Sequence, residues 1–76
     1  MGLSYIPQPS ADVITLLDEQ GTTTYVGKAS PNSPTSEPVW QIRRIVSGVG
    51  TLEVKFADGD TRFDNVWDAR AALGYT

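Results

Sequence analysis

The chain has 76 residues, of which 39% are hydrophobic and 20% charged, so its size fits one small globular domain. It contains neither cysteine nor histidine, which excludes disulfides, thiolate nucleophiles and imidazole bases. Six basic against nine acidic residues give a net charge of -3, so bulk charge does not supply the basic face that nucleic-acid binding needs, and we expect no nucleic-acid partner.

A chain of this length gains little net stability from its own core. Below about 70 to 80 residues, hydrophobic burial and conformational entropy nearly cancel. Small domains compensate with disulfides, metals or partner surfaces, and here a partner surface is the expected source. The first nine residues lack the pattern of a signal peptide, and no apolar stretch approaches the length of a membrane span. A soluble protein without a membrane partner is therefore expected.

Residues 1–10 are predicted to form an extended arm, because Pro7 and Pro9 favour extended backbone in the residues that precede them. Tyr5 and Ile6 are expected to pack on the domain or on a neighbouring molecule. The alternative is a frayed terminus. The remaining residues, 11–76, are predicted to form a single β-rich domain.

The first half of this domain reads as a hairpin followed by a loop. The β-branched residues of segment 11–17 favour a strand over a short helix. A Gln-Gly turn at 20–21 and a β-branched and aromatic run at 22–26 predict a returning strand. Gly27 allows the backbone to bend or a neighbour to approach closely. Residues 29–38 contain three prolines and are predicted to be a loop, which either contacts a partner or crosses between two layers of sheet.

Residues 39–47 and 51–57 carry the strongest strand patterns, and alternate side chains of a strand point to opposite faces. In the first, each face holds apolar groups and an arginine, with Trp40, Ile42 and Arg44 on one side and Val39, Gln41, Arg43 and Ile45 on the other. In the second, the apolar groups share one face, with Leu52, Val54 and Phe56 opposite Glu53 and Lys55. The second pattern predicts a half-buried strand of an antiparallel hairpin.

The C-terminal part changes character after a predicted tight turn at 58–59, from which 61–63 begins a short returning strand. Asp64 is a candidate N-cap, and helical spacing predicts a helix over about 65–73. So short a helix is unstable alone, so Trp67 and Leu73 are expected to dock on the sheet. The expected class is mainly β, a small antiparallel sheet, sandwich or barrel of about four to five strands with one short C-terminal helix.

Three carboxylates, Asp58, Asp60 and Asp64, fall close together in the sequence. A calcium EF-hand loop would place its glycine sixth, whereas Gly59 comes second and Arg62 adds a positive charge. Turn formation and helix capping are the preferred interpretation. We therefore expect neither a metal nor another cofactor.

Arginine and tryptophan are the usual anchors of protein interfaces. With the two arm residues, they make the candidate partner-binding set: Tyr5, Ile6, Trp40, Arg43, Arg44, Trp67 and Arg70. The alternatives are burial of both tryptophans in the core and neutralisation of the basic side chains by neighbouring carboxylates. No serine or threonine can have a histidine base, and no phosphate-binding or nucleophile-elbow motif occurs. No catalytic residue is identified, and no enzymatic activity is expected.

Three segments carry a family resemblance. They are Tyr25-Val26-Gly27-Lys28-Ala29, Trp40-Gln41-Ile42-Arg43-Arg44-Ile45 and the stretch from Phe56 to Arg70, together with a terminal Tyr75. They resemble a group of small bacteriophage-encoded proteins with the pattern Y-(I/V)-G-x-A, W-x-I-(R/K)-(R/K)-I and W-A-D-G with a following F-(D/N)-N-x-W. The match covers roughly two thirds of the chain, and Phe56 replaces the expected tryptophan.

This resemblance implies a minor structural protein of a tailed-phage virion, made in the host cytoplasm and acting by protein–protein contact. It would decorate the capsid, sit at the neck or baseplate, or anchor a fibre, and its partners would be other virion proteins. Copies would follow the symmetry of the particle as a homo-oligomer. The alternatives are a stand-alone intracellular module that inhibits a host protein, and recognition of carbohydrate or host surface through Trp40, Trp67 and the 29–38 loop.

Overall fold

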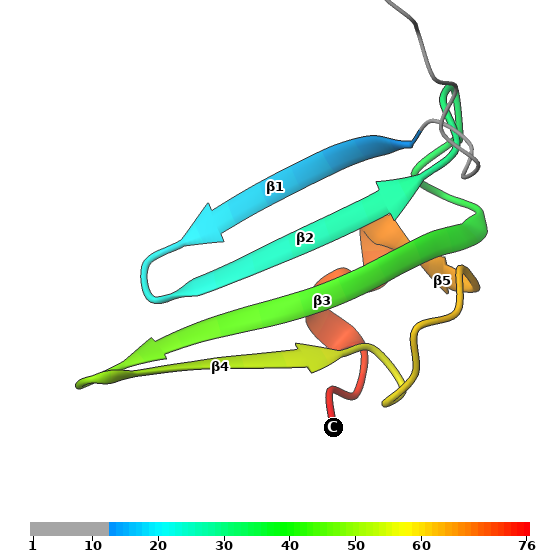
Figure 1. Cartoon of the computed structure of the whole chain (residues 1–76). Coiled ribbons are helices and arrows are strands. Elements are labelled where there is room, and N and C mark those ends of the chain that lie inside the picture. The colour runs from blue at the N-terminus through cyan, green and yellow to red at the C-terminus, as the bar shows by residue number, and fades with distance from the viewer. Residues whose placement is uncertain (1–12) are drawn as a thin grey trace, which may run out of the picture.

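The computed structural model describes residues 13–76 (Figure 1). Its elements, in chain order, are β1 (Ile14–Gln20), β2 (Thr23–Ala29), β3 (Pro38–Gly48), β4 (Thr51–Phe56), β5 (Asn65–Val66) and the 3-10 helix η1 (Trp67–Ala72). The predicted mainly β class with one short C-terminal helix is confirmed. The arm predicted over residues 1–10, with Tyr5 and Ile6, lies outside the described residues.

The four longer strands form one antiparallel sheet in the order β1-β2-β3-β4, and β5 pairs with the beginning of β3. Figure 1 shows η1 behind this sheet, against one of its two faces. The described residues thus form one layer of sheet rather than a sandwich or a barrel. No helix among them is long and apolar enough to cross a membrane.

Glycine and aspartate make the tight turns. Gly21 and Gly50 have φ values of 62° and 75° in the two hairpin loops. Asp58 and Gly59 both lie in the left-handed region, with φ values of 60° and 72°, and the amide of Gly59 donates to the carbonyl of Phe56 over 3.0 Å. Positive φ at both central residues is the geometry that an Asp-Gly pair favours. The predicted turn at 58–59 is therefore confirmed.

The returning strand lies later in the chain than predicted. Residues 61–63 are not in a strand, and the short strand β5 pairs with β3 instead of with β4. The place beside Ala57 is taken by Tyr75, and the amide of Asp58 donates to the carbonyl of Gly74 over 2.8 Å. The C-terminus therefore occupies the position that a strand at 61–63 would need.

Asp64 does not cap the helix, contrary to the prediction. The N-cap position of η1 is Val66, which makes no side-chain capping bond. The carboxylate of Asp64 instead accepts a hydrogen bond of 3.3 Å from Nδ2 of Asn65. The two extended residues of β5 separate Asp64 from the helix, which is a 3-10 helix and begins at Trp67.

The core lies between η1 and the sheet. Trp40 is 0% exposed and Trp67 is 7% exposed, and their ring centroids are 5.9 Å apart. Gly27 passes directly beneath the second indole, where an added Cβ would overlap the Trp67 ring. Leu73 is half-buried against the same cluster. The predicted docking of the helix through Trp67 and Leu73 is therefore confirmed, and the predicted close approach at Gly27 is explained.

The loop from 30 to 37 joins two neighbouring strands of the one sheet. The indole Nε1 of Trp40 donates to the carbonyl of Pro34 over 2.9 Å, which satisfies the polar atom of a buried ring. The amide of Asp68 donates to the carbonyl of Thr35 over 3.1 Å. This loop therefore packs on β3 and η1, and it does not cross between layers.

Candidate interaction surface on the open face of the sheet

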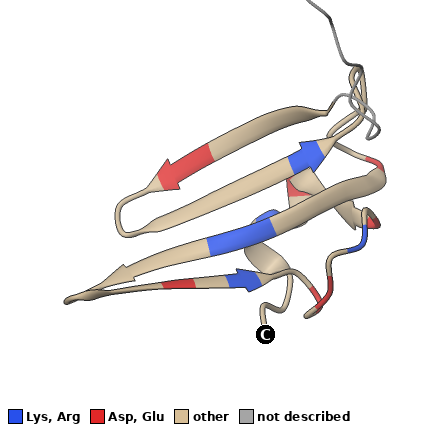
Figure 2. Cartoon of the chain, in the orientation of Figure 1, with Lys and Arg blue, Asp and Glu red and all other residues tan. Residues whose placement is uncertain are grey.

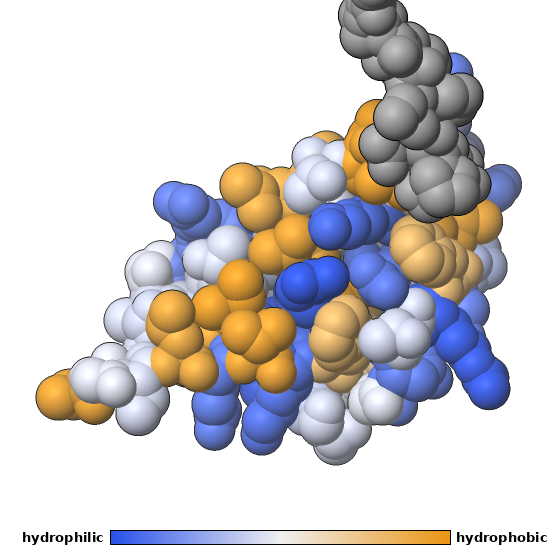
Figure 3. Space-filling view, viewed as in Figure 1, coloured by the Kyte–Doolittle hydropathy of each residue, from blue (hydrophilic) through white to orange (hydrophobic). Residues whose placement is uncertain are grey.

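One face of the sheet is left uncovered by η1. Registers and strand alternation define this open face by the side chains that point away from η1: Thr15, Leu17, Glu19, Thr24, Val26, Lys28, Gln41, Arg43, Ile45, Ser47, Leu52, Val54 and Phe56. Figure 3 shows this face, with hydrophobic side chains spread over the four strands.

The apolar part of the open face is strongly exposed. Leu17 is 63% exposed, Leu52 67% and Val54 50%. Between them, Ile45 pairs directly with Val54, and both belong to adjacent antiparallel strands. Val26 pairs with Leu17 and is the one residue of this group that its neighbours bury. These residues form the apolar strip, in which the Leu17–Val26 pair lies in the row of Arg43 and Phe56 and the Ile45–Val54 pair lies in the next row.

The position of this strip corrects the prediction for β4. Leu52, Val54 and Phe56 were expected to be the buried side of a half-buried strand, yet they lie on the open face. The reason is the register of the strands. The burial of Trp40 places the even-numbered residues of β3 in the core, so Ile45 points to the open face. Val54 is paired with Ile45 and therefore points to the open face as well. The charged side of β4 therefore faces the η1 side.

Basic groups occupy the other end of the open face. The guanidinium of Arg43 lies over the ring of Phe56, 4.9 Å from its centroid, and Lys28 pairs with Gln41 in the register. Figure 2 shows these basic segments in β2 and β3, and an acidic segment at the end of β1, where Glu19 lies. The open face thus has an apolar half beside the β3–β4 hairpin and a basic half toward the opposite ends of these strands.

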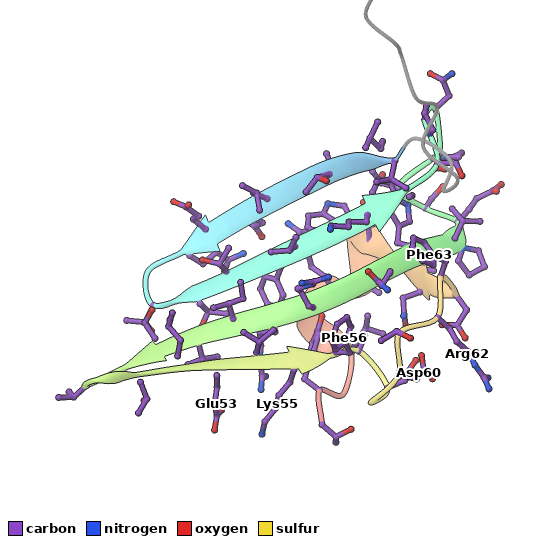
Figure 4. All side chains as sticks on the ribbon, in the orientation of Figure 1. Glu53, Lys55, Phe56, Asp60, Arg62 and Phe63 are labelled. Carbon is purple, nitrogen blue, oxygen red and sulfur yellow. The ribbon has the colours of Figure 1, made fainter. Side chains whose placement is uncertain are left out.

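Arg44 lies on the covered side of the sheet. Its guanidinium is 4.8 Å from the centroid of the Tyr75 ring, and its Nε is buried without a hydrogen-bond partner. Lys55 is directly opposite it in β4. The ammonium of Lys55 is 3.9 Å from a carboxylate oxygen of Glu53, and Figure 4 shows these two side chains next to each other on β4.

Arg70 also makes its contacts on the covered side of the sheet. Its Nε and Nη2 are each 2.8 Å from Oδ2 of Asp18, and its guanidinium is 4.6 Å from the centroid of the Trp67 ring. The hydrogen bond from Arg70, with a second one from Gln20, lowers the pKa of Asp18 below its usual value. The contact ties the C-terminal helix to the first strand.

Tyr75 closes this side of the core. Its hydroxyl donates to the carbonyl of Arg70 over 2.7 Å, and its ring centroid is 6.0 Å from that of Tyr25. Burial raises the pKa of the Tyr75 phenol to about 12, and the nearby Tyr25 adds to the shift.

The structure separates the candidate partner-binding residues. Trp40 and Trp67 are reassigned to the core, because buried rings offer no surface to another molecule. Arg44 and Arg70 stack on rings of the covered side, where they hold the C-terminal segment. Among the described candidates, Arg43 alone belongs to the open face.

Sequence patterns alone do not place apolar residues on that face. The alternation of β4 predicts the strand but puts its apolar side in the core. The apolar residues at issue are Leu17, Ile45, Leu52 and Val54. No local pattern states which side of a sheet a distant helix will cover.

The aspartates of the 58–64 segment act locally. Oδ1 of Asp60 accepts a hydrogen bond of 3.0 Å from the amide of Arg62, and both side chains are marked in Figure 4. Residues 13–76 contain no cluster of three or more metal-ligating side chains and enclose no pocket.

Comparisons with protein-family models, with curated proteins and with solved structures found no match to this chain.

Proposed function

We propose that this protein is a minor structural component of a tailed-bacteriophage virion and that it acts by protein–protein contact through the open face of its sheet. One observation carries the contact role. The apolar side of β4, with Leu52 and Val54, points away from the only layer that covers the sheet in the described part of the chain. Burying a leucine or valine side chain contributes about 1.5 to 3 kcal/mol, so a partner that covers this strip gains substantial free energy.

The phage assignment is supported by the resemblance of the Tyr25–Ala29, Trp40–Ile45 and Phe56–Arg70 segments to small phage-encoded proteins. These segments supply the core tryptophans and Arg43. An assembly subunit of this kind needs no bond chemistry. It also gains stability from neighbours, because binding to the folded state shifts the folding equilibrium. The number of copies per particle would differ between a position on the capsid, at the neck, in the baseplate and at a fibre anchor.

Mass spectrometry of purified particles tests the proposal. We expect the chain in mature particles at a fixed ratio to the major capsid protein, and this ratio separates a capsid-wide role from a neck or tail role. A stand-alone inhibitor of a host protein would instead remain in the infected-cell lysate and be missing from washed particles. That second outcome would overturn the proposal.

A further inference from the structure

We propose that the tip of the β3–β4 hairpin, residues 47–52, inserts into an uncharged apolar groove of another virion protein. The inference rests on the proposed function, since it names the part of this chain that enters a neighbour and the kind of surface that receives it. The tip continues the apolar strip of the open face, because Leu52 belongs to both.

This hairpin reaches beyond the rest of the sheet. The pairing of β2 with β3 ends at Thr23 and Val46, whereas the pairing of β3 with β4 continues to Gly48 and Thr51. The longer hairpin therefore projects by two further rows of residues, about 7 Å at a rise of about 3.3 Å per residue. Figure 1 shows its end lying beyond the turn that joins β1 and β2. A projecting hairpin end is convex, so it fits a concave surface.

The projecting tip is apolar and carries no charge. Residues 45–52 are eight consecutive residues without Asp, Glu, Lys or Arg, in a chain of which 20% is charged. Val49 in the turn is 104% exposed, and Leu52 beside it is 67% exposed. The turn requires a glycine only at Gly50, where φ is 75°, and hairpin turns otherwise favour Asn, Asp and Gly. Neither core packing nor the turn therefore accounts for a valine at position 49.

The chemistry of the tip indicates what receives it. Residues 13–76 enclose no pocket, so the described part of a second copy offers no groove for Val49. A charged groove would lose hydration against a tip that supplies no opposite charge, which is costly. An uncharged apolar groove avoids this cost and gains from the burial of Val49 and Leu52. The recipient is therefore a different protein with such a groove.

Photo-crosslinking in purified particles identifies the recipient. The full chain carries p-benzoylphenylalanine in place of Val49 or, as the control, in place of Thr22, which is exposed in the turn of the shorter hairpin. We expect position 49 to be linked to one other virion protein, and position 22 to give at least tenfold less of this product. Links from position 49 only to a second copy of this chain, or no links at all, would overturn the inference.

Val49→Asp tests how much the contact contributes. Because the side chain is fully exposed, the melting temperature should not change. Incorporation into particles should fall at least about tenfold, since a charge replaces a valine that the groove buries. Val49→Ile and Thr22→Asp should both be incorporated like the unmodified chain.

Two further outcomes would overturn the inference. The first is incorporation of Val49→Asp at the ratio of the unmodified chain, which leaves the proposed function intact. The second is co-sedimentation of the unmodified chain, but not of Val49→Asp, with phosphatidylcholine vesicles, which would assign the tip to a membrane. Particles that lack even the unmodified chain would contradict the proposed function itself, so the two failures are distinguishable.

Discussion

Arg70 and Asp18 join the C-terminal helix to the first strand, although 52 residues separate them in the sequence. Two nitrogens of the guanidinium reach the same carboxylate oxygen at 2.8 Å, and the other face of the guanidinium lies over the Trp67 ring. A charge-assisted pair in this position fixes η1 relative to the edge strand β1. It therefore helps to hold the helix on the face of the sheet where Trp40 is buried.

Replacing Asp18 by asparagine should lower the melting temperature at neutral pH, because it removes the charge that Arg70 contacts. Glu19→Gln is the matched control, since it neutralises the adjacent carboxylate on the exposed open face. Thermal unfolding at pH 7, at concentrations where the chain is monomeric, compares the two. Equal melting temperatures for both variants and the unmodified chain would show that the ion pair contributes nothing.

The pH dependence of this effect has a definite sign. The pKa of Asp18 is lowered in the folded state. Its contribution to the free energy of unfolding is therefore complete above the pKa of the unfolded chain, about 3.9, and is lost as the pH falls through the pKa of the folded chain. The difference in stability between the unmodified chain and Asp18→Asn should therefore shrink below about pH 4. A difference that stays constant from pH 7 to pH 2 would contradict the assignment.

Gly27→Ala should destabilise the fold by about 1 to 3 kcal/mol, because the new Cβ overlaps the Trp67 ring and the indole must shift. Gly74→Ala is the control. Nothing lies within 4 Å of a Cβ added there, so its effect should stay within about 0.5 kcal/mol. Urea unfolding followed by tryptophan fluorescence measures both. The account of the helix contact is wrong if the two substitutions cost the same.

Trp67→Ala should cost about 3 to 5 kcal/mol, since it removes a buried aromatic ring from beneath the helix. Phe63→Ala is the comparison, because this aromatic ring is 48% exposed and its loss should cost far less. An unchanged midpoint of urea unfolding for Trp67→Ala would refute the docking of η1 on the sheet.

The phenol of Tyr75 should titrate near pH 12 in the folded chain. This pKa is higher than the value of about 10 in the unfolded chain. The contribution of the neutral phenol to the free energy of unfolding is therefore complete below about pH 10 and is lost as the pH rises toward 12. Absorbance of tyrosinate, compared between the unmodified chain and Tyr75→Phe, isolates this group. A difference curve centred at pH 10 would contradict the burial of the hydroxyl.

Local patterns predicted much of the fold. Alternation identified β3 and β4 and showed which of their side chains share a face. The Asp-Gly pair at 58–59 predicted its turn. Apolar residues at helical spacing predicted that Trp67 and Leu73 dock. These features depend on neighbouring residues alone, which is why the sequence reveals them.

The open face depends on long-range contacts, and its recognition required the structure. Arg70 binds Asp18, Tyr75 pairs beside Ala57, and Trp67 packs on Trp40, so residues far apart in the sequence together hold the C-terminal segment on one side of the sheet. The apolar alternation of β4 is equally compatible with either side. The alternation alone favours burial of the side that Val54 faces, whereas the C-terminal segment covers the other side.

The incorporation of variants into particles tests the central claim, that the chain functions through the open face in a virion. The measurement is the ratio of this chain to the major capsid protein in purified particles, determined by mass spectrometry for the unmodified chain, Val54→Lys and Val13→Lys. We expect equal incorporation of the unmodified chain and Val13→Lys, and a strong reduction for Val54→Lys. Particles that lack the unmodified chain, or that take up Val54→Lys at the same ratio, would contradict it.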